Sequence, residues 1–250
     1  MKTVVIIPSR YGSSRFEGKP LAKIAGRSMI ERVYQNASAA GRVTDVVVAT
    51  DDRRIAAAVE AFGGRAVMTS AANRSGTDRV GEAAGILGLA RDDIIINIQG
   101  DQPLIDPRCL DEVVEPFSMD PELGMSTLAF AIVRKQEIVD PKDVKVTFDN
   151  NGFALYFSRA TIPHDRDGDM VFDTYKHLGV YAYTRRFLDL FRTLPEGRLE
   201  RIEKLEQLRV LEHGHRIKVV ITEYDSPEVD LPEDIPRIEA LLKAGTAYRP

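Results

Sequence analysis

The apolar run TVVIIP (residues 3–8) leads directly into the polar loop SRYGSSRFEGKPL (residues 9–21). Further short β-branched runs follow, and longer segments with helical periodicity separate them. The predicted strands are TVVIIP from residue 3, DVVVAT from 45, RAVMTS from 65 and DIIINIQ from 93, and the predicted helices cover about 28–40, 53–62 and 78–89. Apolar strands without polar alternation indicate a sheet covered on both faces, and helical connections favour parallel pairing. The sequence therefore predicts a doubly wound α/β core.

The second half of the chain has a different pattern. After about residue 124 it contains the run GMSTLAFAIV, the segment VKVTFDNNGFALYFS with a hairpin-turn signal at Asn151-Gly152, and the run YKHLGVYAYT. A helix over about 199–213, the strand RIKVVIT and a helix over about 233–243 follow. Because no repeat or Pro/Ser-rich linker separates the halves, we expect one domain whose later part extends the same sheet.

The composition limits the classes of function. Lysine and arginine (34) nearly balance aspartate and glutamate (38), so the chain lacks the general basic field that binds nucleic acid. The single cysteine, Cys109, has no partner for an internal disulfide and favours a reducing compartment. The sequence shows no signal-peptide pattern and no run of about 18 apolar residues. We expect a cytoplasmic globular protein that does not bind nucleic acid or insert into a membrane.

Ligands of doubly wound sheets bind beyond the carboxyl ends of the strands. We therefore expect one shared edge for the loops after Ile7, Ala49, Thr69 and Ile98. The opening loop carries three cations, Arg10, Arg15 and Lys19, and its glycines allow close backbone approach. Cations in such a loop can bind phosphate oxygens, arginine by a bidentate fork. The loop matches neither the P-loop pattern nor G-x-G-x-x-G. We interpret it as a phosphate site of another kind, with a solvated basic loop as the alternative.

Two acidic motifs are candidates for a metal site. Asp101 follows an apolar strand in NIQGDQP (residues 97–103), and a carboxylate at that edge can hold magnesium against phosphate oxygens. Asp230 precedes a helix-opening PED run in VDLPED (residues 229–234). The structural alternatives are a turn containing Asp101 and Pro103, and a helix start for Asp230. Spacing alone leaves these interpretations open and does not show that the two aspartates meet.

The segment NRSGTDR (residues 73–79) places small hydroxyl and glycine residues between a strand and a helix. Ser75 or Thr77 can cap that helix, and the backbone of the segment can alternatively contact a base or a sugar. Scattered histidines and one cysteine give no zinc-ligand spacing, and no G-x-S-x-G elbow is present.

Together these motifs resemble the 3-deoxy-manno-octulosonate cytidylyltransferases, also called CMP-Kdo synthetases. The resemblance spans nearly the whole chain. The segments that carry it are VVIIPSRYGSSRFEGKPL, VVVATDD, MTSAANRSGTDRV, NIQGDQPLI, VKVTFDNNGFALYFSRATIPHDRD, KHLGVYAY, IEKLEQLRVLEHG and VDLPEDIPRIE. Each motif alone is weak, but their order and combination are specific.

The resemblance implies an enzyme that transfers CMP from CTP to the anomeric hydroxyl of 3-deoxy-D-manno-octulosonate (Kdo), an acidic eight-carbon sugar. Pyrophosphate is released, and the activated sugar serves lipopolysaccharide biosynthesis. The resemblance also implies a Rossmann-like nucleotidyltransferase fold, Mg²⁺ dependence, a cytoplasmic location and a homodimer. Within the single domain 1–250, residues of about 1–123 would form the CTP-binding core. The part from about residue 124 to 215 would form a β-rich insertion for sugar binding and dimer contacts, and the part from about 216 to 250 would again belong to the core.

The resemblance assigns the site residues by position. The triphosphate contacts are Arg10, Ser13, Arg15 and Lys19. The cytosine and ribose contacts are Ser75, Gly76 and Gln99. The magnesium ligands are Asp101 and Asp230, which together with Arg15 and Lys19 form the catalytic set. The contacts to the acceptor sugar are Arg159, Arg166, His177, Tyr181, Glu206 and Gln207.

Three residues depart from the family pattern: Gln102 stands in place of Glu, His164 in place of Trp and Leu231 in place of Thr, and the stretch after Asp169 is shortened. Gln102 removes a negative charge beside the expected metal site. Two other functions stay open. One is the same chemistry on an 8-amino analogue of Kdo or a sialic-type acid, and the other is a non-catalytic nucleotide-binding regulator.

Overall fold

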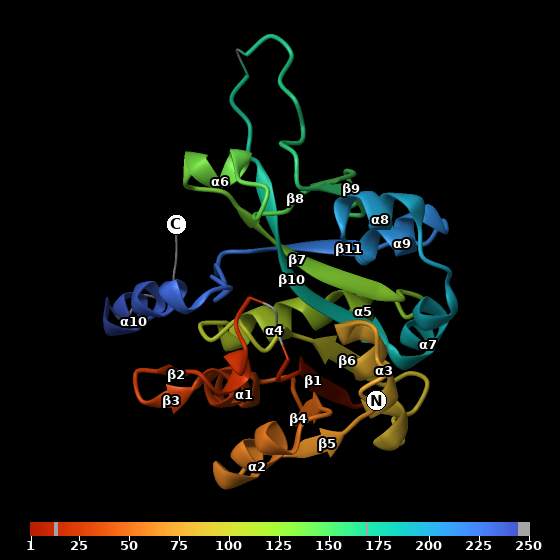
Figure 1. Cartoon of the computed structure of the whole chain (residues 1–250). Helices are drawn as coiled ribbons and strands as arrows, with labels where there is room; N and C mark the ends of the chain where they lie inside the picture. Colours follow the sequence, from red (N-terminus) through yellow and green to blue (C-terminus); the bar gives the residue numbers. More distant parts are fainter. Residues whose placement is uncertain (13–14, 169, 245–250) are drawn as a thin grey trace.

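A nine-stranded sheet forms the centre of the molecule (Figure 1). The computed structural model describes residues 1–12, 15–168 and 170–244. The main strand order is β11-β7-β10-β6-β1-β4-β5, and β8 pairs with β10 and β9. The strands of this sheet are β1 (Thr3–Ser9), β4 (Asp45–Thr50), β5 (Ala66–Met68), β6 (Ile94–Asn97), β7 (Met125–Ala131), β8 (Lys145–Phe148), β9 (Ala154–Ser158), β10 (Tyr175–Thr184) and β11 (Lys218–Thr222). A separate pair is formed by β2 (Lys23–Ile24) and β3 (Arg27–Ser28).

The first half of the chain forms the predicted parallel core. β1 pairs in parallel with both β4 and β6, and β4 pairs in parallel with β5. The carboxyl ends of these four strands therefore face one edge, as the apolar runs and helical connections predicted. That edge carries the opening loop and the loops before α3 and after β6.

The second half extends the same sheet, which confirms the prediction. β10 runs antiparallel to both β6 and β7, and β11 joins β7 in parallel. β8 and β9 form the predicted hairpin, in whose turn Gly152 has a φ of 73°. The segment between β9 and β10 projects at the top of Figure 1. The result is a mostly parallel sheet with one long antiparallel strand, β10, in its interior.

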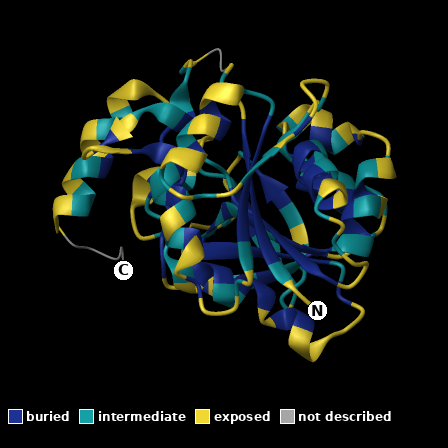
Figure 2. Cartoon of the chain, turned by 90° about the horizontal axis from the view of Figure 1, so that it is seen from below, coloured by how far each residue is buried: buried dark blue, intermediate teal, exposed yellow. Residues whose placement is uncertain are grey.

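Helices cover both faces of the sheet. Alternate residues of β1 pack in opposite directions: Val5 and Ile7 contact the core under α1, α2 and α4, while Val4 and Ile6 contact the core under α3, α7 and α9. Figure 2 shows buried strands inside and exposed residues on the outer sides of the helices. The helices are α1 (Met29–Ser38), α2 (Arg53–Ala61), α3 (Gly76–Ile86), α4 (Pro107–Val114), α5 (Pro116–Met119), α6 (Lys135–Val139), α7 (Arg185–Thr193), α8 (Arg198–Glu203), α9 (Gln207–Glu212) and α10 (Ile235–Ala244), with 3-10 turns at Lys19–Leu21 and Pro232–Asp234.

One predicted helix is wrong. The segment 199–213 is divided into α8 and α9, because Lys204 adopts a left-handed conformation with a φ of 55° that ends α8. The helices α4 to α7 were not predicted, although α4 begins with Asp106 as N-cap and Pro107 in its first position, a recognisable start signal. Within the described part of the chain, no helix has the length and apolar character needed to cross a membrane.

Candidate active site

The opening loop and both aspartates meet at the carboxyl edge of the sheet. Lys19 Nζ lies 2.6 Å from Asp101 Oδ2 and 3.7 Å from Asp230 Oδ1. Arg15 Nη2 lies 3.1 Å from the same oxygen of Asp230. Two cations and two carboxylates from segments far apart in the sequence therefore form one cluster, which we call the charged cluster. Lys19 is its most enclosed member, whereas most of the Arg15 side chain is exposed.

The geometry distinguishes between the two interpretations of Asp230. The backbone N–H groups of Asp230 and Leu231 both donate to Asp234 Oδ2, at 2.8 and 2.9 Å. Asp234 therefore stabilises the helical turn before α10. The side chain of Asp230 instead contacts Arg15 and Lys19.

Asp101 links the charged cluster to the end of β6. Its backbone carbonyl accepts a hydrogen bond from Val229 N–H at 3.0 Å, which holds the segment of Asp230 beside the strand end. The preceding residue is Gly100, where a Cβ would lie 2.9 Å from Ser9 Oγ, so a side chain there would disturb the contact with β1. Asp101 Oδ1 is buried and has no hydrogen-bond partner among the described residues. A buried, unpaired carboxylate oxygen is costly, and it marks a position for a bound cation or donor.

Two cavities meet at the charged cluster. The smaller cavity has a volume of about 400 Å³ and lies between the opening loop and the start of α3, where Arg10, Lys19 and Ser75 line it. The larger cavity has a volume of about 780 Å³ and extends along β10 toward α6 and α9. The residues that line both are Arg15, Gly76, Gln99, Asp101 and Glu206. The charged cluster therefore stands between two spaces of the size that small ligands occupy.

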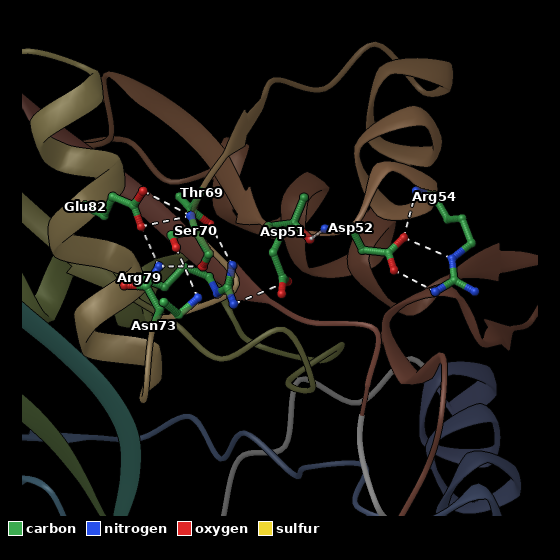
Figure 3. A network of polar contacts seen from close by, with 10 residues as sticks. Asp51, Asp52, Arg54, Thr69, Ser70, Asn73, Arg79 and Glu82 are labelled. Carbon is green, nitrogen blue, oxygen red and sulfur yellow. Dashed lines mark hydrogen bonds and ion pairs between the residues drawn. The ribbon is translucent and has the colours of Figure 1, made fainter.

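A polar network holds the wall of the smaller cavity (Figure 3). Arg79 in α3 is buried, donates to Thr69 Oγ1 at 2.6 Å and lies 3.3 Å from Asp51 Oδ1. Glu82, one turn further along α3, accepts from the backbone N–H of Ser70 at 3.0 Å. These contacts join the ends of β4 and β5 to α3 (Figure 3) and hold the segment 69–75, of which residues 73–75 line the smaller cavity.

Ser75 and Gly76 stand at the N-terminus of α3. Ser75 Oγ accepts from Asp78 N–H at 3.2 Å, so it caps the helix, and it also lines the smaller cavity. The two interpretations of this segment are therefore compatible. A Cβ on Gly76 would lie 3.5 Å from the ring of Pro8 and 3.9 Å from Gln99 Oε1, which shows how closely α3 approaches the ends of β1 and β6.

β10 is irregular where it borders the larger cavity. Its register with β7 shifts between His177 and Tyr181, and Gly179 has a φ of 66°, a conformation that favours glycine. The rings of His177 and Tyr181 lie 5.1 Å apart and both border the cavity. Desolvation by the surrounding protein disfavours the charged forms, so it lowers the pKa of His177 to about 3 and raises that of Tyr181 well above its usual value. Both side chains are therefore neutral at physiological pH and contribute hydrogen bonds rather than charge.

Gln102 contacts this irregular segment. Its Nε2 donates to Leu178 O at 2.5 Å and to Glu228 Oε1 at 3.3 Å. An ionised glutamate could donate neither bond, so the structure accounts for glutamine at a position where the family resemblance gives glutamate. Glu228 lines the larger cavity, and desolvation, followed by the charges of Asp101 and Asp230, raises its pKa to about 8.

The break between α8 and α9 positions further predicted residues. Glu206 Oε2 accepts from Thr77 Oγ1 at 2.6 Å, which joins α9 to the start of α3. Gln207 is buried, and its Nε2 has no hydrogen-bond partner among the residues that the structure describes. Arg159 Nε donates to Glu203 O at the end of α8, at 2.8 Å. Glu206, Gln207 and Arg159 all line the larger cavity.

Some predicted positions lie elsewhere. Arg166 is exposed in the projecting segment between β9 and β10, where it pairs with Asp167 at 2.9 Å, and it lines neither of the two cavities. His164 is exposed in the same segment. Ser13 and Asp169 lie outside the described residues.

The sequence analysis missed a charged group in the lining of the larger cavity. Lys176 Nζ lies 2.9 Å from both Glu137 Oε1 and Asp225 Oδ2, and all three side chains are nearly inaccessible. Burial alone would lower the pKa of Lys176, but the two carboxylates together outweigh it and raise the pKa. The available signal was a lysine inside the otherwise aromatic and apolar run YKHLGVYAYT.

The comparisons with known proteins identify the family. The profile of the cytidylyltransferase family matches residues 4–217. A 3-deoxy-manno-octulosonate cytidylyltransferase of Desulfatibacillum aliphaticivorans is 70% identical to this chain over 97% of the chain and 99% of the relative. The chain belongs to the cytidylyltransferase family. An 8-amino-3,8-dideoxy-manno-octulosonate cytidylyltransferase of Shewanella piezotolerans is 59% identical over 97% of this chain and 99% of that protein.

A solved structure agrees with this assignment. The structure of CMP:2-keto-3-deoxy-manno-octonic acid synthetase complexed with CTP is 41% identical, with a TM-score of 0.92 over 98% of this chain and 100% of the other. The predicted family and the Rossmann-like nucleotidyltransferase fold are confirmed, and the cytidylyltransferase is a nucleotidyltransferase enzyme. The roles of the individual residues stay predictions.

Proposed function

We propose that the protein transfers CMP from CTP to Kdo and releases pyrophosphate. The observation that carries this proposal is the charged cluster of Lys19, Asp101, Asp230 and Arg15 between two cavities. A cationic loop beside the smaller cavity suits a triphosphate, and the larger cavity suits a sugar. Relatives that are 70% and 67% identical carry the name of the Kdo enzyme, which supports the same acceptor here.

We propose that Asp101 and Asp230 hold Mg²⁺ together with phosphate oxygens of CTP. The buried and unpaired Oδ1 of Asp101 fits such an ion. Magnesium at nucleotide sites is usually bound by only one or two carboxylates, with the substrate completing the shell. In residues 1–12, 15–168 and 170–244, no three His, Cys, Asp or Glu side chains are arranged to hold a metal by themselves, which is compatible with a shell shared with the substrate. When bound, the ion would activate the sugar hydroxyl and stabilise negative charge that develops on the phosphate.

The residues of the chain supply position and charge. The anomeric hydroxyl of Kdo loses its proton to solvent, its oxygen attacks the α-phosphorus in line to form one P–O bond, and the bond to the leaving pyrophosphate breaks. Lys19 and Arg15 contact the carboxylates of Asp101 and Asp230 in this structure. When the triphosphate binds beside them, the two cations neutralise the negative charge of the leaving pyrophosphate. Ser75, Gly76 and Gln99 hold the cytosine and ribose. Holding both substrates in one geometry lowers the entropic part of the barrier.

The acceptor sugar occupies the larger cavity. There its carboxylate needs cationic or N–H partners and its hydroxyls need donors and acceptors. The side chains of that cavity that we assign to Kdo are Arg159, His177, Tyr181, Glu206 and Gln207. Arg166, which the resemblance also gives to the sugar, lines neither cavity, and its role stays a prediction.

We also propose that the enzyme is a cytoplasmic homodimer that serves lipopolysaccharide biosynthesis. Several large apolar side chains are exposed near α6, β9 and the projecting segment, and they support a self-association face. These are Val133, Val139, Leu155, Val171 and Phe172. The molar mass in solution tests the dimer: two chains are expected, and a monomer at assay concentration contradicts it.

The activity is tested by incubating the protein with CTP, Mg²⁺ and Kdo and measuring pyrophosphate. We expect release that requires all three additions, and CMP-Kdo as the second product. Reactions without sugar, with UTP in place of CTP, and with excess EDTA serve as controls. If no pyrophosphate is released while an authentic Kdo enzyme is active alongside, the proposal is wrong.

An 8-amino analogue of Kdo is the second candidate acceptor. Relatives of 57% to 59% identity carry the name of that activity, somewhat below the identity of the Kdo relatives. The ratio of kcat/KM values for Kdo, the 8-amino analogue and a sialic-type acid decides between them. We expect Kdo to have the highest value, and a higher value for another sugar would replace the first proposal.

A further inference from the structure

Thr127 in β7 contacts both the irregular segment of β10 and the ring of His177. Its Oγ1 lies 2.7 Å from Val180 O and 2.9 Å from His177 Nε2. Thr127 itself is fully buried and lies opposite Tyr181 in the β7–β10 register. A single hydroxyl group therefore serves two partners, one of which is a backbone carbonyl that can only accept.

The hydroxyl proton can be assigned by counting donors. Thr127 has one O–H donor and accepts through its lone pairs. If the proton pointed at His177, two oxygens, Thr127 Oγ1 and Val180 O, would face each other 2.7 Å apart with no hydrogen between them. The proton therefore goes to Val180 O. The nitrogen Nε2 of His177 must then carry a hydrogen and donate it to Thr127.

The opposite nitrogen of the ring is left as an acceptor. His177 is neutral because its surroundings lower its pKa to about 3, so a hydrogen on Nε2 leaves a lone pair on Nδ1. Nδ1 has no hydrogen-bond partner among the described residues. A buried atom without a partner would be among the buried unpaired atoms, and Nδ1 is not one of them, so Nδ1 is accessible. Because His177 lines the larger cavity, we take Nδ1 to face that cavity. Phe157 and Tyr181 pack against the ring, each with centroids 5.1 Å away, and fix its plane.

We propose that Thr127 is a positioning residue that fixes the Nε2–H form of His177, so that Nδ1 accepts a hydrogen bond from a hydroxyl group of the acceptor sugar. This inference rests on the proposed function, because it takes the larger cavity as the acceptor site. It also excludes one contact: an ionised carboxylate has no hydrogen to donate, so His177 does not bind the carboxylate of the sugar. That group is left to the cationic side chains of the cavity.

The form of His177 is measured directly by long-range ¹H–¹⁵N correlation on the full chain labelled with ¹⁵N-histidine. The chain has four histidines, and His177→Gln identifies the relevant signals. We expect a protonated Nε2 and an unprotonated Nδ1, and addition of Kdo should move the Nδ1 signal without protonating it. A protonated Nδ1 in the wild-type protein overturns the proposal, and so does an Nδ1 signal that saturating Kdo leaves unmoved.

Kinetics then test the link to the sugar. Thr127→Val keeps the shape of the side chain but removes the hydroxyl, and we expect the KM for Kdo to rise about tenfold while the KM for CTP stays unchanged. Thr127→Ser retains the hydroxyl and should restore both the spectrum and the KM. If Thr127→Val changes the tautomer but not the KM for Kdo, the proposal fails. Should Thr127→Val not fold, the wild-type spectrum, its response to Kdo and the Thr127→Ser variant decide. Absence of turnover with any sugar would instead contradict the proposed function. The spectra would still test whether Thr127 fixes the Nε2–H form of His177.

Discussion

The smaller and larger cavities are assembled in different ways. The smaller cavity is lined mainly by three short stretches of the chain at or beyond the carboxyl ends of β1, β5 and β6, within residues 8–12, 15–20, 73–79 and 99–101. Most residues of the larger cavity come from segments dispersed between 97 and 237, and they depend on the irregular segment of β10 and on the break before α9. The first cavity follows from the topology of the sheet. The second follows from local departures from regular structure.

The largest expected effect is at the charged cluster, where the two cavities meet. Asp101→Asn and Asp230→Asn keep the size of the side chain but remove the charge. We expect each to lower kcat by about 100- to 1,000-fold, because charge stabilisation at the reacting phosphate is lost. Pyrophosphate release at saturating substrates measures this, and circular dichroism checks the fold. Glu233→Gln, an exposed acid three residues from Asp230, is the control and should keep full activity. Near-normal kcat with unchanged Mg²⁺ dependence in either variant contradicts the assignment.

Lys19→Ala tests whether the smaller cavity holds the triphosphate. Lys19 contacts both aspartates, and we expect its loss to lower kcat/KM for CTP by about 10- to 100-fold, the usual cost of a charged hydrogen bond. The KM for the sugar should change little, which keeps the two cavities functionally distinct. Lys23→Ala removes an exposed lysine four residues away and is the matched control. If kcat/KM for CTP is the same in both variants, Lys19 does not bind the triphosphate.

The same comparison explains what the sequence could and could not predict. Arg15, Lys19 and Asp101 follow strands whose apolar runs are unmistakable, so parallel pairing alone brings their loops to one edge. The contact of Asp230 with them depends on the backbone bond between Val229 and Asp101, which no local pattern encodes.

The acceptor side was less accessible to prediction. β10 has a register shift, and Lys204 adopts a left-handed conformation. Tertiary contacts determine both features and override local propensity, so the sequence pattern does not show them. The resemblance supplied His177 and Glu206 by position. The contacts of Thr127 and Lys176 became visible only in the folded arrangement.

Gln102→Glu sharpens the comparison, because Gln102 stands next to Asp101 but supports the wall of the larger cavity. The change removes the donor to Leu178 O and turns an acceptor oxygen toward that carbonyl, so we expect a loss of about 1–3 kcal/mol in the free energy of unfolding. Adding Glu228→Gln supplies a donor to the new carboxylate and should restore part of the loss. Urea unfolding of the wild type, the two single variants and the double variant measures this double-mutant cycle. Strict additivity would show that the two side chains are not coupled.

A pH dependence of stability follows from His177 on the same wall. Its pKa is about 3 in the folded protein and 6.5 when unperturbed, so between these values the unfolded chain binds a proton that the folded chain does not. Stability therefore rises with pH across this window and falls on acidification. From pH 7.5 to 5, His177 should account for a loss of about 2 kcal/mol. Urea unfolding of the wild type and His177→Gln at both pH values isolates the contribution of His177 to the free energy of unfolding. Equal pH dependence in the two proteins would contradict the prediction.

The smallest effect concerns the break between α8 and α9, which the sequence pattern did not reveal. Lys204 pays a steric cost in its left-handed conformation, whereas glycine adopts it freely. We expect Lys204→Gly to raise the free energy of unfolding by about 0.5–1 kcal/mol, because the break itself is preserved. Arg201→Gly, inside α8, makes the same replacement in regular helix and should lower it by about 0.5–1 kcal/mol. Opposite signs for the two variants would establish the break as a property of the protein in solution. If both replacements destabilise equally, 199–213 is one helix, and the contact of Glu206 with Thr77 would need another explanation.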